Sequence, residues 1–185
     1  MQYVAIGVRC LIGVVFLASS VSKVIGRDAF GAFVASLQGM KILPSIFVRL
    51  AAYLVIGAEF STCVTLAIPG QLFAMIGFAA AAILFTLFIA GISLSLRRGI
   101  HAPCRCFGAS VIPLGSRHIV RNVGLVAVVV VGVLTALSGG SVDVSGAVVA
   151  MFAGLLLGGM AIIIDDVLGL FLPINGPSNP VRTGR

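Results

Sequence analysis

The chain has 185 residues, of which 60% are hydrophobic and 9% are charged, and its mean hydropathy is +1.24. This composition excludes a soluble globular domain, in which about a quarter of the residues are usually charged. The net charge of +7 does not indicate a nucleic-acid partner, because the basic residues stand at the ends of apolar segments, where they orient a chain in a bilayer. We predict an all-α, multi-pass membrane protein that contacts the lipid bilayer along its helices.

Apolar segments of about 20 residues, long enough to cross a hydrocarbon core about 30 Å thick, recur along the chain. They predict five spanning helices, at about residues 3–24, 46–68, 71–96, 119–138 and 146–164. The fifth helix has room to continue past Asp165-Asp166 as far as Leu172. Between the first two, residues 27–43 carry apolar side chains at helical spacing among polar ones, which predicts a short helix lying at the membrane interface.

These elements form one predicted domain over residues 1–172, followed by a Pro/Gly/Asn/Ser-rich tail over residues 173–185 that we expect to be flexible. Orientation follows from the positive-inside rule, because the connections after the first and third spans are basic and the other two are not. The rule predicts an N-terminus outside the cell and a cytoplasmic connection between the third and fourth spans. The basic residues concerned are Lys23, Arg27, Lys41, Arg49, Arg97, Arg98, Arg105, Arg117 and Arg121.

The connection between the third and fourth spans holds two thiols, Cys104 and Cys106, on either side of Arg105. Nearby cations favour the thiolate, which is the reactive form of cysteine, so we expect lowered pKa values for these thiols. A disulfide between them would close a small strained ring, and strained exposed disulfides are the labile ones. A redox-active dithiol is therefore the favoured interpretation, beside the alternative of simple free thiols or a loop clip.

A metal site is a further alternative, because His101 and His118 flank the two cysteines and two thiolates with two imidazoles would suit tetrahedral zinc. The spacing matches no standard zinc module, so our prediction includes no metal or other cofactor. His118 equally suits a proton relay to a thiol.

A second group of reactive or charged residues lies inside the predicted spans. Cys10 and Cys63 fall at similar depths in the first and second helices, and the charged residues Arg9 and Glu59 share that layer. Each charge would be costly in hydrocarbon unless it were paired, so we expect an ion pair between Arg9 and Glu59 beside a possible Cys10/Cys63 pair. The pairing either locks two helices together or forms part of a proton or electron relay.

Two minor features complete the reading of the spans. Lys23 and Arg49 stand at helix ends, where such side chains usually extend to the lipid headgroups. The spacing of Gly154 and Gly158 permits close helix packing, although glycine is common in this chain.

Several of these residues support a family comparison. A helical bundle with Lys23 ending the first helix, Glu59 inside the second, a Cys-Arg-Cys-Phe-Gly segment and Arg121-Asn122 opening the fourth helix resembles the MauE family of DoxX-like membrane proteins. The resemblance covers about residues 4–138 and implies a DoxX-like four-helix core, to which the chain adds a fifth helix. In this comparison, Phe107 and Gly108 continue the cysteine motif. We expect Arg121 and Asn122 to cap the cysteine segment or hydrogen-bond its backbone, and so to hold the cysteines in place, rather than to take part in catalysis.

The resemblance implies a redox-associated membrane protein that supports maturation of a partner enzyme in methylamine utilisation, together with a thioredoxin-like protein on the outer face. That face disagrees with the cytoplasmic side predicted here for Cys104 and Cys106. We expect thiol–disulfide exchange through these two cysteines. The alternatives are a non-catalytic accessory subunit of a larger membrane assembly, such as a respiratory or transport complex, and oxidation linked to a quinone.

Overall fold

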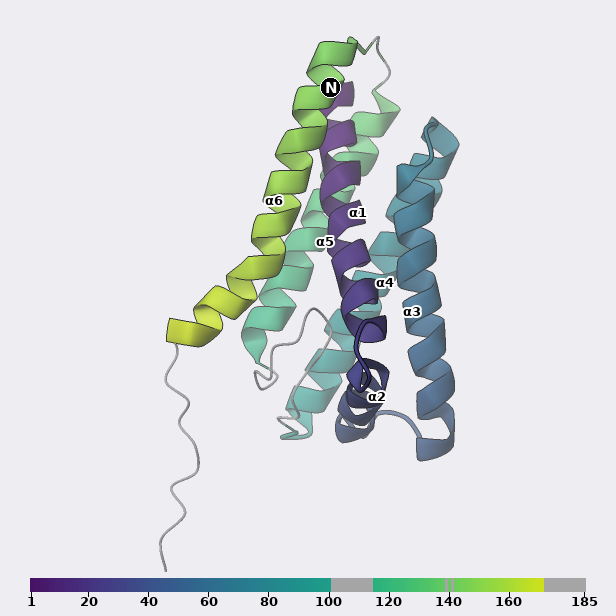
Figure 1. Ribbon diagram of the computed structural model, residues 1–185, viewed down its shortest axis with the longest axis vertical. Coiled ribbons are helices and arrows are strands. Elements are labelled where there is room, and N and C mark those ends of the chain that lie inside the picture. Colours follow the sequence, from purple (N-terminus) through teal and green to yellow (C-terminus); the bar gives the residue numbers. More distant parts are fainter. Residues whose placement is uncertain (101–114, 139, 141, 172–185) are drawn as a thin grey trace, which may run out of the picture.

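The computed structural model describes residues 1–100, 115–138, 140 and 142–171, and within them the protein is entirely helical apart from turns and short connections. Six helices follow one another (Figure 1), namely α1 Gln2–Val24, α2 Ala29–Gly39, α3 Ser45–Ala67, α4 Gln71–Arg97, α5 Ser116–Leu137 and α6 Val144–Phe171. All except α2 contain a segment long and apolar enough to cross a membrane. The predicted fold class, a polytopic helical bundle, is thereby confirmed.

The five spans lie where hydropathy places them, and the differences are at the ends. The fourth predicted span begins at residue 119, but α5 begins at Ser116, because a helix can start with a polar turn that a search for apolar residues leaves out. The backbone of α6 continues past Asp165-Asp166 to Phe171, as the sequence allowed. The predicted short helix of residues 27–43 is present as α2, in which Phe33 is buried, as is Met40 directly after the helix.

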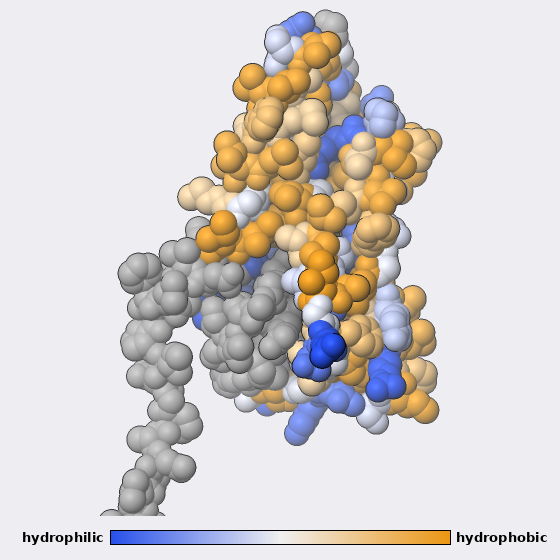
Figure 2. All heavy atoms as spheres, in the orientation of Figure 1, coloured by the Kyte–Doolittle hydropathy of each residue, from blue (hydrophilic) through white to orange (hydrophobic). Residues whose placement is uncertain are grey.

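Helix α1 is the centre of the bundle and contacts each of the other helices. Its inner face places Ile12 and Phe16 out of reach of solvent, and the Phe16 ring stacks on Phe85 of α4 with 4.8 Å between the ring centroids. In Figure 1, α6 lies on one side of α1 and α3 lies on the other, while α4 and α5 run behind α1. Figure 2 shows that apolar side chains cover much of the surface of the long helices, as expected where lipid replaces water.

The two ends of the bundle differ in charge. At one end, here called the α2 end, α1 and α4 finish, α3 and α5 begin and α2 is attached (Figure 1). The opposite end, here called the N-terminal end, carries residue 1, the Pro69-Gly70 turn and the connection between α5 and α6. Among the described residues, the basic ones at or near the α2 end are Lys23, Arg27, Lys41, Arg49, Arg97, Arg98, Arg117 and Arg121.

Close packing of α1 and α6 depends on the absence of side chains. A Cβ atom added at Gly154 would overlap the carbonyl oxygen of Gly7, with the carbonyl carbon of Gly7 only 2.9 Å away. One turn further along α6, a Cβ at Gly158 would come within 2.9 Å of the carbonyl oxygen of Leu11. The close packing that the Gly154-x3-Gly158 spacing suggested is therefore present, between α6 and α1.

Candidate functional site

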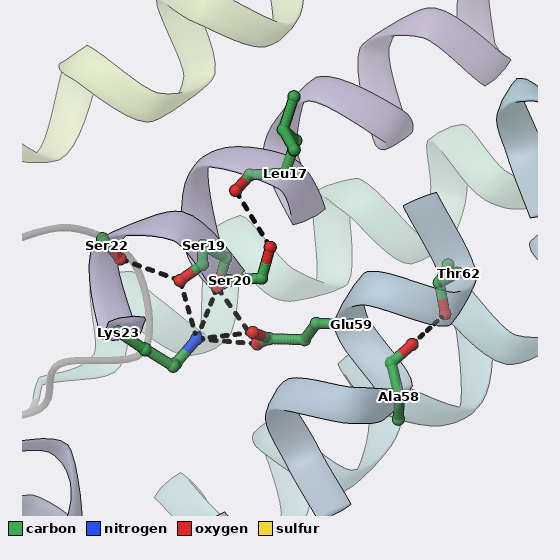
Figure 3. Close-up of polar contacts among 8 residues, drawn as sticks. All are labelled: Leu17, Ser19, Ser20, Ser22, Lys23, Ala58, Glu59 and Thr62. Carbon is green, nitrogen blue, oxygen red and sulfur yellow. Dashed lines mark hydrogen bonds and ion pairs between the residues drawn. The ribbon is translucent and has the colours of Figure 1, made fainter. Parts of the chain in front are cut away.

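The most strongly polar cluster of the described core joins α1 to α3 and consists of Lys23, Ser19 and Glu59 (Figure 3). The Lys23 ammonium donates to both carboxylate oxygens of Glu59, at 2.7 Å to Oε1 and 2.8 Å to Oε2. It also donates to the Ser19 hydroxyl at 2.6 Å, and that hydroxyl donates to Glu59 Oε1 at 3.0 Å. Each partner is thus bound to the other two.

Burial makes this cluster important. The exposed fraction is 2% for Lys23 and 0% for Glu59, so neither charge reaches water. The Lys23 ammonium also lies 5.1 Å from the ring centroid of Phe33, on α2, within the range of a cation–π contact. A buried ion pair needs its remaining hydrogen-bonding capacity filled, and the hydroxyl and carbonyl oxygen of Ser19 supply much of it here. The expectation that Lys23 extends to the headgroups is therefore wrong.

The predicted Arg9–Glu59 ion pair is also wrong, because Glu59 is paired with Lys23. Side chains on a helix tilt toward its N-terminus, so Lys23 reaches back into the bundle toward Glu59 while Arg9 reaches toward the N-terminal end. Arg9 contacts Leu66 instead, and Leu66 follows Glu59 by seven residues, about 10 Å along the helix. The estimate that Arg9 and Glu59 lie at similar depths counts residues from the helix ends and leaves out the tilt of each side chain toward the N-terminus of its helix.

Arg9 finds its partners at the end of α3. Its Nε and Nη2 atoms donate to the carbonyl oxygen of Leu66 at 3.0 and 2.9 Å, and Nη2 also donates to the carbonyl oxygen of Ile68. The last carbonyls of a helix have no partner within it and form the negative end of its dipole. The guanidinium therefore caps α3 and ties it to α1 near the Pro69-Gly70 turn.

Cys10 and Cys63 are both free thiols, and both are half-buried. They line the same cavity, of about 530 Å³, at the N-terminal end. The structure therefore brings them to one space, as expected from their depths, and forms no disulfide between them. Formation of a bond between the two under oxidising conditions stays a prediction.

The start of α5 places three of the predicted residues. His118 and Asn122 lie one turn apart on the buried face, with exposed fractions of 6% and 0%, and Arg121 is half-buried beside them. Among the described residues, neither the Oδ1 nor the Nδ2 atom of Asn122 has a hydrogen-bond partner. A buried amide is usually bonded, so Asn122 is a polar group available to a ligand or another segment. Its contact with the cysteine segment stays a prediction.

Comparison with known families settles which family the chain represents. The family described as methylamine utilisation protein MauE matches residues 1–135, most of the chain. The chain belongs to the MauE family. No curated protein and no solved structure matches it. The resemblance drawn from the cysteine motif, Lys23, Glu59 and Arg121-Asn122 is therefore confirmed.

The MauE match covers α1 to α4 and all but the last two residues of α5, so α6 lies beyond it. The segment with His101, Cys104, Arg105, Cys106, Phe107 and Gly108 falls inside the match but outside the described residues. It joins the end of α4 to the start of α5, so both of its attachment points are at the α2 end. The zinc alternative, which needs three of these residues, stays a prediction.

Sequence reasoning missed Ser19 as a partner of the buried charges and treated Lys23 as a surface residue. The spacing offered a clue, because Ser19 precedes Lys23 by four residues and therefore lies on the same face of the helix. A serine one turn before a lysine in an otherwise apolar span indicates a polar face directed inward. In this MauE protein the face belongs to α1 and meets α3.

Proposed function

We propose that this protein exchanges thiol and disulfide equivalents with a thioredoxin-like partner through Cys104 and Cys106, and so supports maturation of a partner enzyme in methylamine utilisation. The observation that carries the proposal is the MauE family match over residues 1–135, which includes the dithiol segment. The family name supplies methylamine utilisation, and the two thiols supply a reaction by which such a protein could act on another.

The chemistry balances within the two proteins. A thiolate of Cys104 or Cys106 attacks one sulfur of the partner disulfide, which breaks that bond and gives a mixed disulfide and a partner thiolate. The second cysteine then attacks the mixed disulfide and releases the partner as a dithiol. The partner gains two electrons and two protons, and Cys104 and Cys106 are left joined as a disulfide.

Charge near the attachment points of the segment favours this reaction. Arg97 and Arg98 stand at the end of α4, and Arg117 and Arg121 stand in the first two turns of α5. Arg98 is itself held in place, because its Nη1 atom donates to the carbonyl oxygen of Lys41 at 2.8 Å. Cations close to a thiol favour its thiolate, the form that attacks disulfides.

Trapping of the mixed disulfide tests the proposal. In Cys104→Ser or Cys106→Ser, the second attack lacks its thiol, so at least one of the single variants should accumulate a reductant-sensitive adduct with a thioredoxin-like protein in native membranes. The matched control is the double variant, which keeps Cys10 and Cys63 and should form no adduct. An adduct in the double variant, or none in either single variant, would favour the accessory-subunit alternative.

A further inference from the structure

The cavity lined by Cys10 and Cys63 also contains a charge, that of Arg9, which has no opposite charge in reach among the described residues. It lies between α1, α3 and α6 at the N-terminal end, and its walls are apolar apart from the two thiols and Arg9. Its lining includes Gly13 of α1 and Met151 and Leu155 of α6. Figure 2 shows hydrophilic surface enclosed by apolar atoms in the upper half of this view, over the region between α1 and α3.

The Arg9 guanidinium is only partly satisfied by the protein. Nε and Nη2 donate to carbonyl oxygens of Leu66 and Ile68, whereas Nη1 donates to no acceptor among the described residues. These carbonyls are neutral groups at the end of a helix. Their dipole offsets about half of a unit charge, so a net positive charge remains at the cavity wall.

No carboxylate among the side chains that the structure describes is placed to neutralise it. The sequence has five Asp and Glu residues. Glu59 is bound to Lys23, and Asp143 is exposed and accepts hydrogen bonds from Ser145. Asp28 precedes α2 at the opposite end. The remaining two, Asp165 and Asp166, follow the last cavity residue of α6, Leu155, by ten residues or more, about 15 Å along the helix.

The depth of Arg9 in the membrane indicates which kind of anion can reach the cavity. Arg9 binds the final carbonyls of α3, which are the point where a membrane-spanning helix ends and the chain turns at Pro69-Gly70. Spanning helices end near the lipid headgroups. The cavity thus joins an apolar space at hydrocarbon depth to a cation near headgroup depth, and a molecule with an anionic head and an apolar tail has the complementary shape and charge.

We propose that this cavity binds an anionic phospholipid, with a phosphate oxygen accepting hydrogen bonds from Nη1 of Arg9 and an acyl chain lying against the apolar walls of α1, α3 and α6. Arg is well suited to phosphate, because its planar guanidinium offers several donors in a fixed arrangement. The two thiols are part of the wall, so a bound lipid covers them. This site is independent of Cys104 and Cys106 and of the reaction proposed for them.

Lipid retention tests the site directly. The full chain, purified in detergent, is mixed with phosphatidylglycerol or phosphatidylcholine, and native mass spectrometry counts the lipids that stay bound. We expect a tightly retained phosphatidylglycerol and no equivalent phosphatidylcholine. At about ten times the dissociation constant, phosphatidylglycerol should also slow maleimide modification of Cys10 and Cys63 by about tenfold, because only the unoccupied fraction reacts.

Two variants locate the site. Arg9→Gln should weaken phosphatidylglycerol retention by about tenfold or more, equal to about 1.4 kcal/mol. Because that change also removes contacts to α3, a second variant leaves Arg9 intact. Gly13 lines the cavity and has no atom within 4 Å of an added Cβ, so Gly13→Leu should fill the space and abolish retention. The matched control is Gly57→Leu on α3, which also has open space and lies outside this cavity.

Three results would overturn the proposal. Equal retention of phosphatidylcholine, undiminished by Arg9→Gln, would mean that lipid adheres to the surface without a charge-specific site. Equal retention in Gly13→Leu and wild type would place the lipid elsewhere. Protection of Cys10 and Cys63 by inorganic phosphate as strong as that by phosphatidylglycerol would identify a site for a soluble anion instead.

Discussion

Lys23 and Glu59 show how a membrane-embedded ion pair can be satisfied by its own helix and a neighbouring one. The pair joins α1 to α3, and Ser19, one turn before Lys23, bonds both partners. Taking two charges out of water is costly, and the cost is recovered only when geometry is good and remaining hydrogen-bonding groups are filled. Both conditions hold here, so the cluster positions α1 against α3 rather than weakening the bundle.

The charged residues could be read from the sequence, but not their pairing. Arg9, Lys23 and Glu59 are conspicuous in apolar spans, but the sequence predicts a need for a partner only for Arg9 and Glu59 and places Lys23 at the headgroups. Which partner each takes depends on the tilt of side chains toward the helix N-terminus and on the stagger of α1 against α3. Hydropathy contains neither the side-chain tilt nor the stagger of the two helices. The sequence therefore predicts Arg9 as the partner of Glu59, whereas the partner in the structure is Lys23.

Removing one partner of the pair should be more damaging than removing both. Lys23→Met leaves the Glu59 carboxylate buried without its opposite charge, and Glu59→Met does the same to the Lys23 ammonium. Each change should lower the free energy of unfolding by roughly 3–5 kcal/mol. Lys23→Met with Glu59→Met replaces the pair by apolar side chains and should recover much of that loss. Thermal unfolding in detergent, followed by circular dichroism, measures all three.

The control for that comparison is Lys41→Met, because Lys41 is an exposed lysine of the same end of the bundle. It should change the unfolding temperature little, since exposed charges contribute little to stability. A double variant as unstable as the worse single variant would show that the two residues do not act as a pair.

Among the helices, the contact of α1 with α6 is the one most sensitive to small changes. Gly154 and Gly158 face the backbone of α1, and backbone atoms cannot move aside as a flexible side chain can. In lipid, helices associate through packing rather than through the hydrophobic effect, so close approach of two backbones is a main source of attraction. The MauE match ends before α6, so this contact attaches an additional helix to the family bundle.

Gly154→Ala should separate α6 from α1. Its Cβ would overlap the carbonyl group of Gly7, and relief of that overlap should cost about 1–3 kcal/mol, as for other overpacked sites. Gly159→Ala is the matched control, because it changes the same helix by the same methyl group with nothing within 4 Å. Faster proteolysis of α6 in detergent for Gly154→Ala, but not for Gly159→Ala, is the expected result; equal rates would contradict it.

Helix positions were predictable because one property, hydropathy over about 20 residues, decides whether a segment crosses a bilayer. Each of α1, α3 and α4 begins and ends within one residue of its prediction. The ends of α5 and α6 were less predictable, since polar residues at Ser116 and at Asp165-Asp166 continue a helix beyond its apolar part. Helix contacts, such as that of Gly154 with Gly7, required the three-dimensional structure.

The two ends of the bundle differ in how many basic residues they carry. Basic residues gather at the α2 end, whereas the connection between α5 and α6 at the opposite end carries Asp143 as its one charged residue. The attachment points of the cysteine segment are therefore on the basic side. The positive-inside rule predicts that this side faces the cytoplasm, and the periplasmic role implied by the family would need the reverse.

Labelling of the thiols distinguishes the two orientations. A membrane-impermeant maleimide should fail to modify Cys104 and Cys106 in intact cells and should modify them in inverted vesicles, because short loops rich in Lys and Arg stay in the cytoplasm. The reporter is the chain with Cys10→Ser and Cys63→Ser, which leaves only the two loop thiols to react. Strong labelling from outside would reverse the topology and place the dithiol where a periplasmic thioredoxin-like partner could reach it.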